Sequence, residues 1–197
     1  MQYTLDQSDT VTTPSGATLY RIQYADGTRG GYLQSTANLD PDGDARVRGN
    51  AQVYGDARVR GNAQVYGDAR VRGNAQVYGD AWVHGDAWVY GDAWVYGNAR
   101  VHGNAQVHGD AWVHGDARVS APEHCLAIGP LGSRKATLTV CRDSKLGISY
   151  KTGCFFGSRD AFVAAVEATH GNTPHGNAYV AAIMLADHVV PAFGSED

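Results

Sequence analysis

The chain has few cysteines and no apolar run long enough to cross a membrane. Its three cysteines are an odd number without metal-ligand spacing, so reduced thiols in a cytoplasm are the simplest interpretation. A membrane span needs roughly 18 consecutive apolar residues, and no segment approaches that length. The first residues, Met-Gln-Tyr-Thr-Leu-Asp, lack the basic and apolar regions of a secretion signal. We therefore expect a cytoplasmic protein that does not act on membranes.

The chain also lacks an excess of positive charge. Its formal net charge is −4. Residues 43–120 contain as many arginines as aspartates, and no basic stripe is present to bind nucleic-acid phosphates. The aspartates alternate with asparagines, so no continuous acidic ladder imitates DNA. We expect no nucleic-acid partner.

Thirteen consecutive hexapeptides dominate what is present. From Gly43 to Ser120 the sequence reads Gly-(Asp/Asn)-Ala-x-Val-x without a break. Because side chains alternate along a strand, Ala and Val share one face and the two variable residues share the other. Gly accepts backbone angles that other residues resist, and Asp and Asn also suit turns. The repeat predicts a climbing coil of short strands and corners, with a narrow Ala and Val interior.

Three sides of six residues make a turn of about 18 residues, and residues 18 apart should stack about 4.8 Å above one another. The early repeat unit is really twelve residues, which does not divide into eighteen. Stacked neighbours therefore alternate Arg with Gln or Tyr, and Asp with Asn, which avoids most contacts between like charges. The predicted outward columns before each Val are Arg46, Gln64, Trp82, Arg100 and Arg118; Gln52, Arg70, Trp88 and Gln106; and Arg58, Gln76, Trp94 and Trp112.

This hexapeptide pattern resembles that of left-handed parallel β-helices, over residues 43–120. At about 18 residues a turn, these residues would make about four coils, and the resemblance implies that the coils of this mainly β protein are left-handed. Acyltransferases and γ-class carbonic anhydrases use this fold, as do proteins without known activity, so the fold alone selects no function.

Non-repetitive segments flank the coils. Residues 1–42 are predicted to be a small β cap, because the ends of a solenoid expose strand backbone and apolar core. Residues 43–120 form the predicted β-helix, and residues 121–197 a predicted C-terminal α+β domain. In that domain we expect strands at Cys125–Ile128, Ala136–Arg142 and Gly147–Phe156. A helix capped by Ser158 should run to about His170, and a second from about Asn177 to Val189.

The whole layout resembles uncharacterised phage and prophage hexapeptide-repeat proteins. The resemblance rests on Gly-Gly-Tyr-Leu at residues 30–33, Gly-Cys-Phe-Phe-Gly at 153–157, and Thr-His-Gly at 169–171. It implies no known chemistry. A viral origin would make interference with a host system a reasonable role.

Histidine tests the enzymatic interpretation. Hexapeptide acyltransferases typically use a His base at a subunit interface, and γ-class carbonic anhydrases gather three His around zinc. Here His102, His108 and His114 are six residues apart, so they should lie on three different faces of one coil. His84 and His102 should stack, which provides two ligands at most. We therefore expect no metal site, no cofactor and no catalytic residue within one subunit, and His simply occupies a position that Tyr and Arg also use.

The outward aromatic residues are the best candidates for a functional surface. Exposed patches of Trp and Tyr usually mark contact surfaces. Three occupants are open: other copies in a parallel trimer, a different protein, or the C-terminal domain of the same chain. Stacked rings could also stiffen the solenoid without any partner. An ice-binding surface is disfavoured, because no flat Thr-x-Thr array is present. The candidate interface residues are Tyr78, Trp82, Trp88, Trp94, Tyr96, Trp112 and His114.

The sequence thus favours a non-enzymatic scaffold that forms a homotrimer and acts through protein–protein contacts, including contacts with a host or phage protein. The alternative is an acyltransferase-like enzyme with His at a subunit interface.

Overall fold

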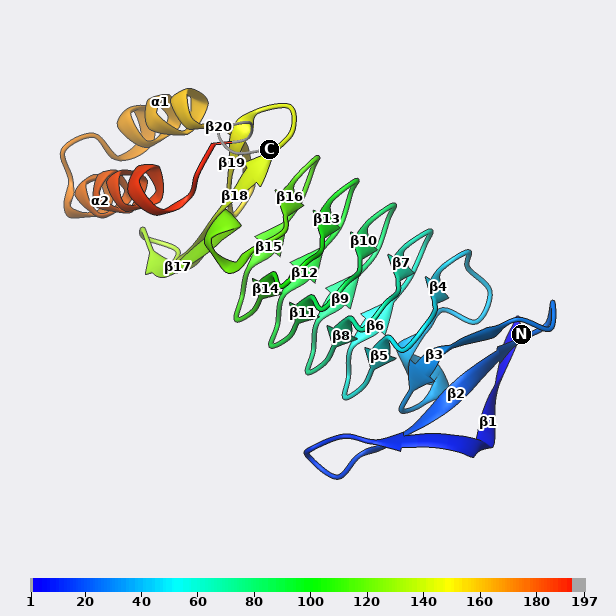
Figure 1. The fold of residues 1–197 in the computed structure, drawn as a ribbon. Helices are drawn as coiled ribbons and strands as arrows, with labels where there is room; N and C mark the ends of the chain where they lie inside the picture. Colours follow the sequence, from blue (N-terminus) through cyan, green and yellow to red (C-terminus); the bar gives the residue numbers. More distant parts are fainter. Residues whose placement is uncertain (1, 193–197) are drawn as a thin grey trace.

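Each hexapeptide folds as a two-residue strand followed by a turn in the computed structural model, which describes residues 2–192. These strands stack into a solenoid of about five turns, with the N-terminal strands at one end and the C-terminal helices at the other (Figure 1). The strands are β4 (Arg46–Val47), β5 (Gln52–Val53), β6 (Arg58–Val59), β7 (Gln64–Val65), β8 (Arg70–Val71), β9 (Gln76–Val77), β10 (Trp82–Val83), β11 (Trp88–Val89), β12 (Trp94–Val95), β13 (Arg100–Val101), β14 (Gln106–Val107), β15 (Trp112–Val113) and β16 (Arg118–Val119).

The strands form three parallel sheets, which we call faces one, two and three. Face one contains β4, β7, β10, β13 and β16; face two contains β5, β8, β11 and β14; face three contains β6, β9, β12 and β15. Each strand pairs with the strand 18 residues away, as when Trp94 lies between Gln76 and Trp112. The predicted 18-residue turn and the three columns are confirmed.

The corners show why the repeat requires glycine. From Gly49 to Gly115, every repeat glycine has φ between 58° and 74°. The glycines of successive coils also stack closely, so that a Cβ added to Gly91 would lie 2.9 Å from the backbone nitrogen of Gly109. Beside them, Asn50 donates a hydrogen bond to the Asp68 carboxylate at 3.2 Å, which confirms the stacking of Asn on Asp.

The interior of the solenoid consists of the repeat Ala and Val side chains. Every one of them from Ala45 to Val119 is at most 2% exposed. Because these side chains are small, they fill the narrow space that three short strands per turn enclose. The predicted inward positions are confirmed.

The solenoid begins earlier than the repeat does. Strands β1 (Tyr3–Thr12), β2 (Thr18–Tyr24) and β3 (Arg29–Leu33) pair antiparallel in sequence, and β3 then pairs parallel with β5. After the short 3-10 helix η1 (Thr36–Asn38), Leu39 bridges to Val59 on face three. These non-repetitive residues add part of a coil, so the prediction of about four coils was too low.

Side chains of the N-terminal segment satisfy the backbone of the first coils. The Tyr24 hydroxyl donates to the carbonyl of Val47 at 3.1 Å and accepts from its N–H at 2.8 Å. The buried Asn38 amide donates to the carbonyls of Gly55 and Ala57, both at 2.9 Å. The end of the solenoid therefore leaves these backbone groups paired, as buried polar groups require.

After the 3-10 helix η2 (Pro122–His124), the C-terminal domain contains four strands rather than the three predicted. They form one antiparallel sheet in sequence order, because Gly153, at φ 49°, turns the chain inside the third predicted strand. The strands are β17 (Cys125–Leu131), β18 (Ala136–Asp143), β19 (Gly147–Thr152) and β20 (Phe155–Ser158).

Two helices follow the sheet. Helix α1 (Arg159–His170) has the predicted cap, since the Ser158 hydroxyl accepts from the N–H of Ala161. Helix α2 (Pro174–Val189) starts three residues before the predicted position, because Thr173 caps it and proline suits the first turn. Neither helix is long and apolar enough to cross a bilayer.

Strand β18 separates two cores. Cys141 belongs to the core of the solenoid, whereas Leu138 and Val140 pack with the helices. Because side chains alternate along a strand, one face of β18 packs on the end of the solenoid and the other face packs on the helices. At its edge, Asp143 bridges to Ala117 of the last coil.

The cysteines differ from the prediction of three reduced thiols. Cys125 on β17 and Cys141 on β18 are opposite each other in the sheet and form a disulfide. Only Cys154 is free, and it is exposed. The sequence spacing could not show this pairing, because it arises from the register of two strands.

Candidate functional site

Five of the predicted interface residues form a continuous aromatic ladder on face three. They come from β9, β12 and β15 and the positions just after these strands. Trp94 stacks on Trp112 with ring centroids 5.2 Å apart, and Tyr78 stacks on Tyr96 at 5.0 Å. Edge-on contacts join the two columns. We define this aromatic ladder as Tyr78, Trp94, Tyr96, Trp112 and His114.

The rings of the aromatic ladder are half-buried by one another and half-open. Trp112 is 36% exposed. Burial, and then the neighbouring Tyr78, raises the pKa of Tyr96 to about 12, which disfavours a charged phenolate on this face. A neutral, ring-lined face with hydroxyl groups at its edge is chemically suited to bind another protein surface.

The C-terminal domain covers one end of the aromatic ladder. Phe156 of β20 packs edge-on against the His114 ring at 4.5 Å. The ammonium group of Lys151 lies 4.8 Å from the centre of the Trp112 ring. The backbone N–H of Trp112 donates a hydrogen bond to the Thr139 hydroxyl at 2.9 Å. The C-terminal domain therefore covers only the aromatic residues of the last coil, because these contacts do not involve Tyr78 or Trp94.

His114 is the most constrained member of the aromatic ladder. Its ring lies 4.2 Å from that of Tyr96, and its buried Nδ1 has no hydrogen-bond partner among residues 2–192. Burial lowers its pKa, and the charge of Lys151 adds to this effect. The imidazole is therefore held neutral.

The other two predicted interface residues lie on different faces. Trp82 is on face one, 39% exposed, with Tyr66 edge-on at 6.1 Å and the Arg100 guanidinium at 5.1 Å. Trp88 is on face two and contacts two arginine side chains, Arg70 at 4.9 Å and Arg72 at 5.7 Å. The structure thus does not bring all seven residues onto one surface.

The histidines follow the predicted geometry. His84 and His102 stack on face one with ring centroids 5.0 Å apart. Burial, then His102 and Arg100, lowers the pKa of His84. His102, His108 and His114 follow strands of three different sheets, so they do not converge. Within residues 2–192, no three His, Cys, Asp or Glu side chains are grouped to hold a metal.

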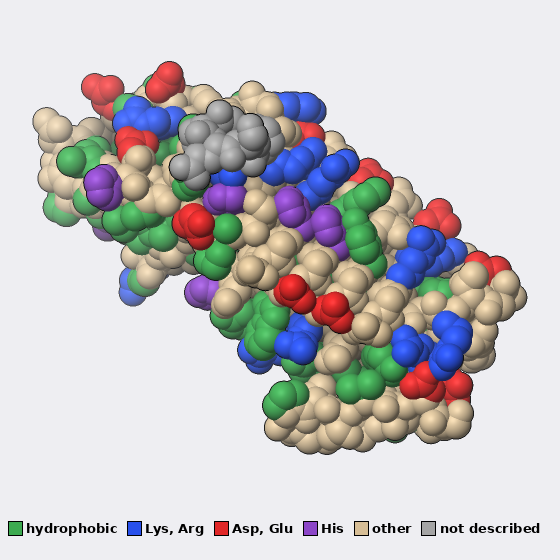
Figure 2. Space-filling model, in the orientation of Figure 1, with side chains coloured by type: hydrophobic (Ala, Val, Ile, Leu, Met, Phe, Trp, Pro, Cys, Tyr) green, Lys and Arg blue, Asp and Glu red, His purple; other side chains and the backbone are tan. Residues whose placement is uncertain are grey.

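Charges of both signs are interspersed along the solenoid. Figure 2 shows blue basic, red acidic, purple histidine and green apolar side chains following one another over the coils on the side in view.

Sequence reasoning missed the contribution of Thr139, Lys151 and Phe156. They lie in strands of the C-terminal sheet, and only the tertiary structure brings them to the aromatic ladder. The one available signal was the general need of a solenoid end for a cap.

The comparisons with known proteins concern the coils. A model of the family described as YdcK Beta solenoid repeat matches residues 51–63, 63–78, 75–91 and 93–109. These segments make up less than a third of the chain. No curated protein matches the chain. The repeats are thus similar to those of a known β-solenoid family, and together with the observed coils they identify the chain as a β-solenoid repeat protein.

Proposed function

We propose that this protein is a non-enzymatic scaffold that assembles into a homotrimer through face three. The observation that carries the proposal is the aromatic ladder, a row of half-open rings on one flat parallel sheet. Rings of this kind are favoured anchors of protein interfaces. Their polar edges also explain how such a surface stays soluble before assembly.

A second copy of the chain is a well-matched occupant of this face. Its strands have the same spacing, so its own rings would meet those of the first copy in register along several coils. The coils contain as many arginines as aspartates, so they add no net charge to the repulsion between copies. A parallel three-fold arrangement would place the three C-terminal domains at one end.

The rest of the proposal builds on the resemblance to phage and prophage hexapeptide-repeat proteins. The coils would be left-handed, and the assembly would present its C-terminal domains to a protein of the host or the phage. The cytoplasm remains the proposed location. Because disulfides persist mainly in oxidising compartments, this location requires Cys125 and Cys141 to be reduced in the cell. Alkylation of thiols in intact cells, followed by mass spectrometry, tests that requirement.

A matched pair of double variants tests the assembly. Tyr78 and Trp94 meet edge-on at 5.8 Å on face three, and Tyr66 and Trp82 meet in the same way at 6.1 Å on face one. Changing either pair to Gln removes the same two ring types, and Gln already occupies outward positions such as Gln64 and Gln76. Trp112 is left intact, because it contacts the C-terminal domain.

Light scattering measures the mass of each variant and circular dichroism its fold. We expect Tyr78→Gln with Trp94→Gln to dissociate the trimer, at a cost of about 2 kcal/mol or more per lost anchor, while Tyr66→Gln with Trp82→Gln stays trimeric. A monomeric parent protein contradicts self-association. If the parent is a trimer and both variants keep its mass, the trimer forms through another surface.

The alternative, an acyltransferase-like enzyme, is favoured by one observation. His114 lies at the covered end of the aromatic ladder, and its buried Nδ1 has no hydrogen-bond partner within residues 2–192; a neutral imidazole nitrogen of this kind can accept a proton as a general base. The test offers the protein an acyl thioester and measures transfer of the acyl group by the release of the free thiol. Activity that His114→Tyr abolishes without changing the mass would support the enzyme and overturn the scaffold.

A further inference from the structure

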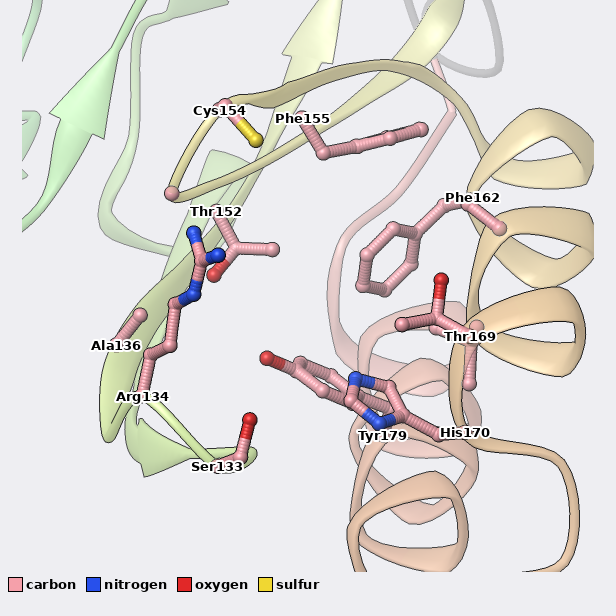
Figure 3. A pocket seen from close by; sticks show the side chains of 13 residues that line it. Ser133, Arg134, Ala136, Thr152, Cys154, Phe155, Phe162, Thr169, His170 and Tyr179 are labelled. Atoms are coloured by element: carbon pink, nitrogen blue, oxygen red, sulfur yellow. The ribbon is translucent and has the colours of Figure 1, made fainter.

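A pocket in the C-terminal domain lies outside the solenoid and has no part in the proposed assembly. It has a volume of about 310 Å³ and lies between the β17–β18 loop, the β19–β20 turn and the two helices (Figure 3). This volume is at the lower end of the range for small-molecule sites, which is roughly 300 to 1,000 Å³. It suits a ligand of about one ring.

One wall of the cavity is aromatic. Phe162 of α1 contacts Phe155 at 5.0 Å and meets Tyr179 of α2 edge-on at 5.7 Å. His170 stacks on the other side of Tyr179 at 5.5 Å. Figure 3 shows the Phe162 ring and the Tyr179 hydroxyl pointing into the space. This wall suits an apolar, ring-sized group.

The opposite wall carries positive charge. In Figure 3 the Arg134 guanidinium lies near Thr152, across the cavity from the rings. The Oγ1 atom of Thr152 is buried, so it is closed to a ligand in the cavity. Arg134 is exposed and forms no ion pair with any acidic side chain of residues 2–192, and none of the residues that line the cavity is acidic. A guanidinium without an acidic partner is available to the carboxylate of a ligand.

The cavity is already formed without a ligand. Gly132, at φ 67°, lets the β17–β18 loop approach α2 so closely that a Cβ there would lie 2.5 Å from the Tyr179 hydroxyl oxygen. Lys135 in the same loop has φ 50°, which holds the loop in a defined bend. The Lys151 ammonium donates to the Gly153 carbonyl and fixes the opposite turn. Binding would therefore require little rearrangement.

We propose that this cavity binds a small organic acid, with its carboxylate at the Arg134 guanidinium and its apolar body against Phe162 and Tyr179. A guanidinium can donate two parallel hydrogen bonds to a carboxylate, and an amide or an alcohol accepts them less well. The site is separate from face three, so binding does not depend on the proposed trimer. It gives the C-terminal domain a function of its own, the recognition of a small acidic molecule.

The test uses the full chain, labelled with ¹⁵N, and phenylacetate as the probe. Phenylacetamide serves as the neutral control of the same shape. Three variants are compared: Arg134→Gln removes the proposed partner of the carboxylate, and Lys135→Asn removes the neighbouring charge, which does not line this cavity. Asn tolerates the positive φ at that position. Ala165→Phe fills the cavity from α1 without changing any charge.

We expect phenylacetate to shift the amide signals of Thr152, Phe162 and Tyr179, with much weaker effects from phenylacetamide. Arg134→Gln should weaken binding about tenfold or more, as the loss of a charged hydrogen bond predicts, and Ala165→Phe should abolish it. Lys135→Asn should bind like the parent. Equal binding of the acid and the amide, equal losses in Arg134→Gln and Lys135→Asn, or no shifts at millimolar phenylacetate would overturn the proposal. Unchanged amide signals from β17, whose Leu126 and Ile128 pack against the core of this domain, show that the C-terminal domain of each variant is folded.

Discussion

The coils of the solenoid and the two segments that close it are stabilised by different kinds of contact. Inside the coils, each strand meets a near-copy of itself, so the backbone ladder and the Ala and Val core recur every 18 residues, and Asn side chains such as Asn50 donate to an Asp 18 residues further on. At the two ends, single side chains that do not repeat make the corresponding contacts. At the N-terminal end, Tyr24 and Asn38 donate hydrogen bonds to backbone carbonyls of the first coils. At the C-terminal end, Cys141 packs into the solenoid core and Phe156 packs against the corner at Gly115.

The comparison indicates where the structure is replaceable. A coil contacts only its neighbours, so one more or one fewer would leave the remaining contacts intact. An end has no equivalent elsewhere in the chain. Stability should therefore depend on a few residues of the closing segments as strongly as on the core.

The strongest test removes both closing segments. A fragment of residues 43–120 keeps all thirteen repeats but loses β3 and Leu39 from the first coil and β18 from the last. It should unfold or aggregate, because both ends then expose unpaired strands and apolar core. Gel filtration and thermal melting measure the outcome. A soluble monomer with a cooperative transition would show that the coils suffice by themselves.

A substitution inside the coils should have the next largest effect. Val95 is 0% exposed, so Val95→Asp places a carboxylate without a partner in the core. We expect a loss of more than about 3 kcal/mol in the free energy of unfolding, measured by urea denaturation. Gln106→Asp, at an exposed outward position, is the control and should change stability by less than about 0.5 kcal/mol. Equal stability of the two variants would contradict the inward position of Val95.

A smaller effect is expected at the N-terminal end. Tyr24→Phe removes one hydroxyl that serves both backbone groups of Val47, which remain buried. Leaving them unpaired should cost about 1–3 kcal/mol in the free energy of unfolding. Tyr20→Phe, in the same strand, is the control and should change little. If the two variants melt alike, the cap does not depend on this hydroxyl.

The same contrast explains what the sequence could predict. The register of the coils follows from local periodicity, so the columns that place Trp94 over Gln76 were predictable from residue numbers alone. The contacts of Phe156 with His114 and of Cys125 with Cys141 join segments of unrelated sequence, and no period relates them. The cavity beside Arg134 requires two loops and two helices to meet, and only the structure shows that.

The smallest expected effect is a pH dependence at the C-terminal end. Burial against Phe156 and Tyr96, together with the charge of Lys151, lowers the pKa of His114, while the more distant Asp143 and Asp116 oppose the shift. The unfolded chain has the ordinary pKa of about 6.5. Below this pH the unfolded state takes up a proton that the folded state resists, so the stabilisation present at higher pH is lost as the pH falls.

His114→Tyr removes this titration and keeps a ring in a position that Tyr78 and Tyr96 already occupy in their coils. Urea midpoints between pH 7.5 and 5 should therefore fall more steeply for the parent than for the variant. His84, whose pKa is also lowered, titrates in both proteins and cancels in the difference. Parallel pH profiles would show that the C-terminal domain does not hold His114 neutral. A steeper profile for the parent would make the junction between the last coil and the C-terminal sheet an acid-sensitive end of the solenoid, whereas a tyrosine hydroxyl and an amide pair the backbone at the N-terminal end.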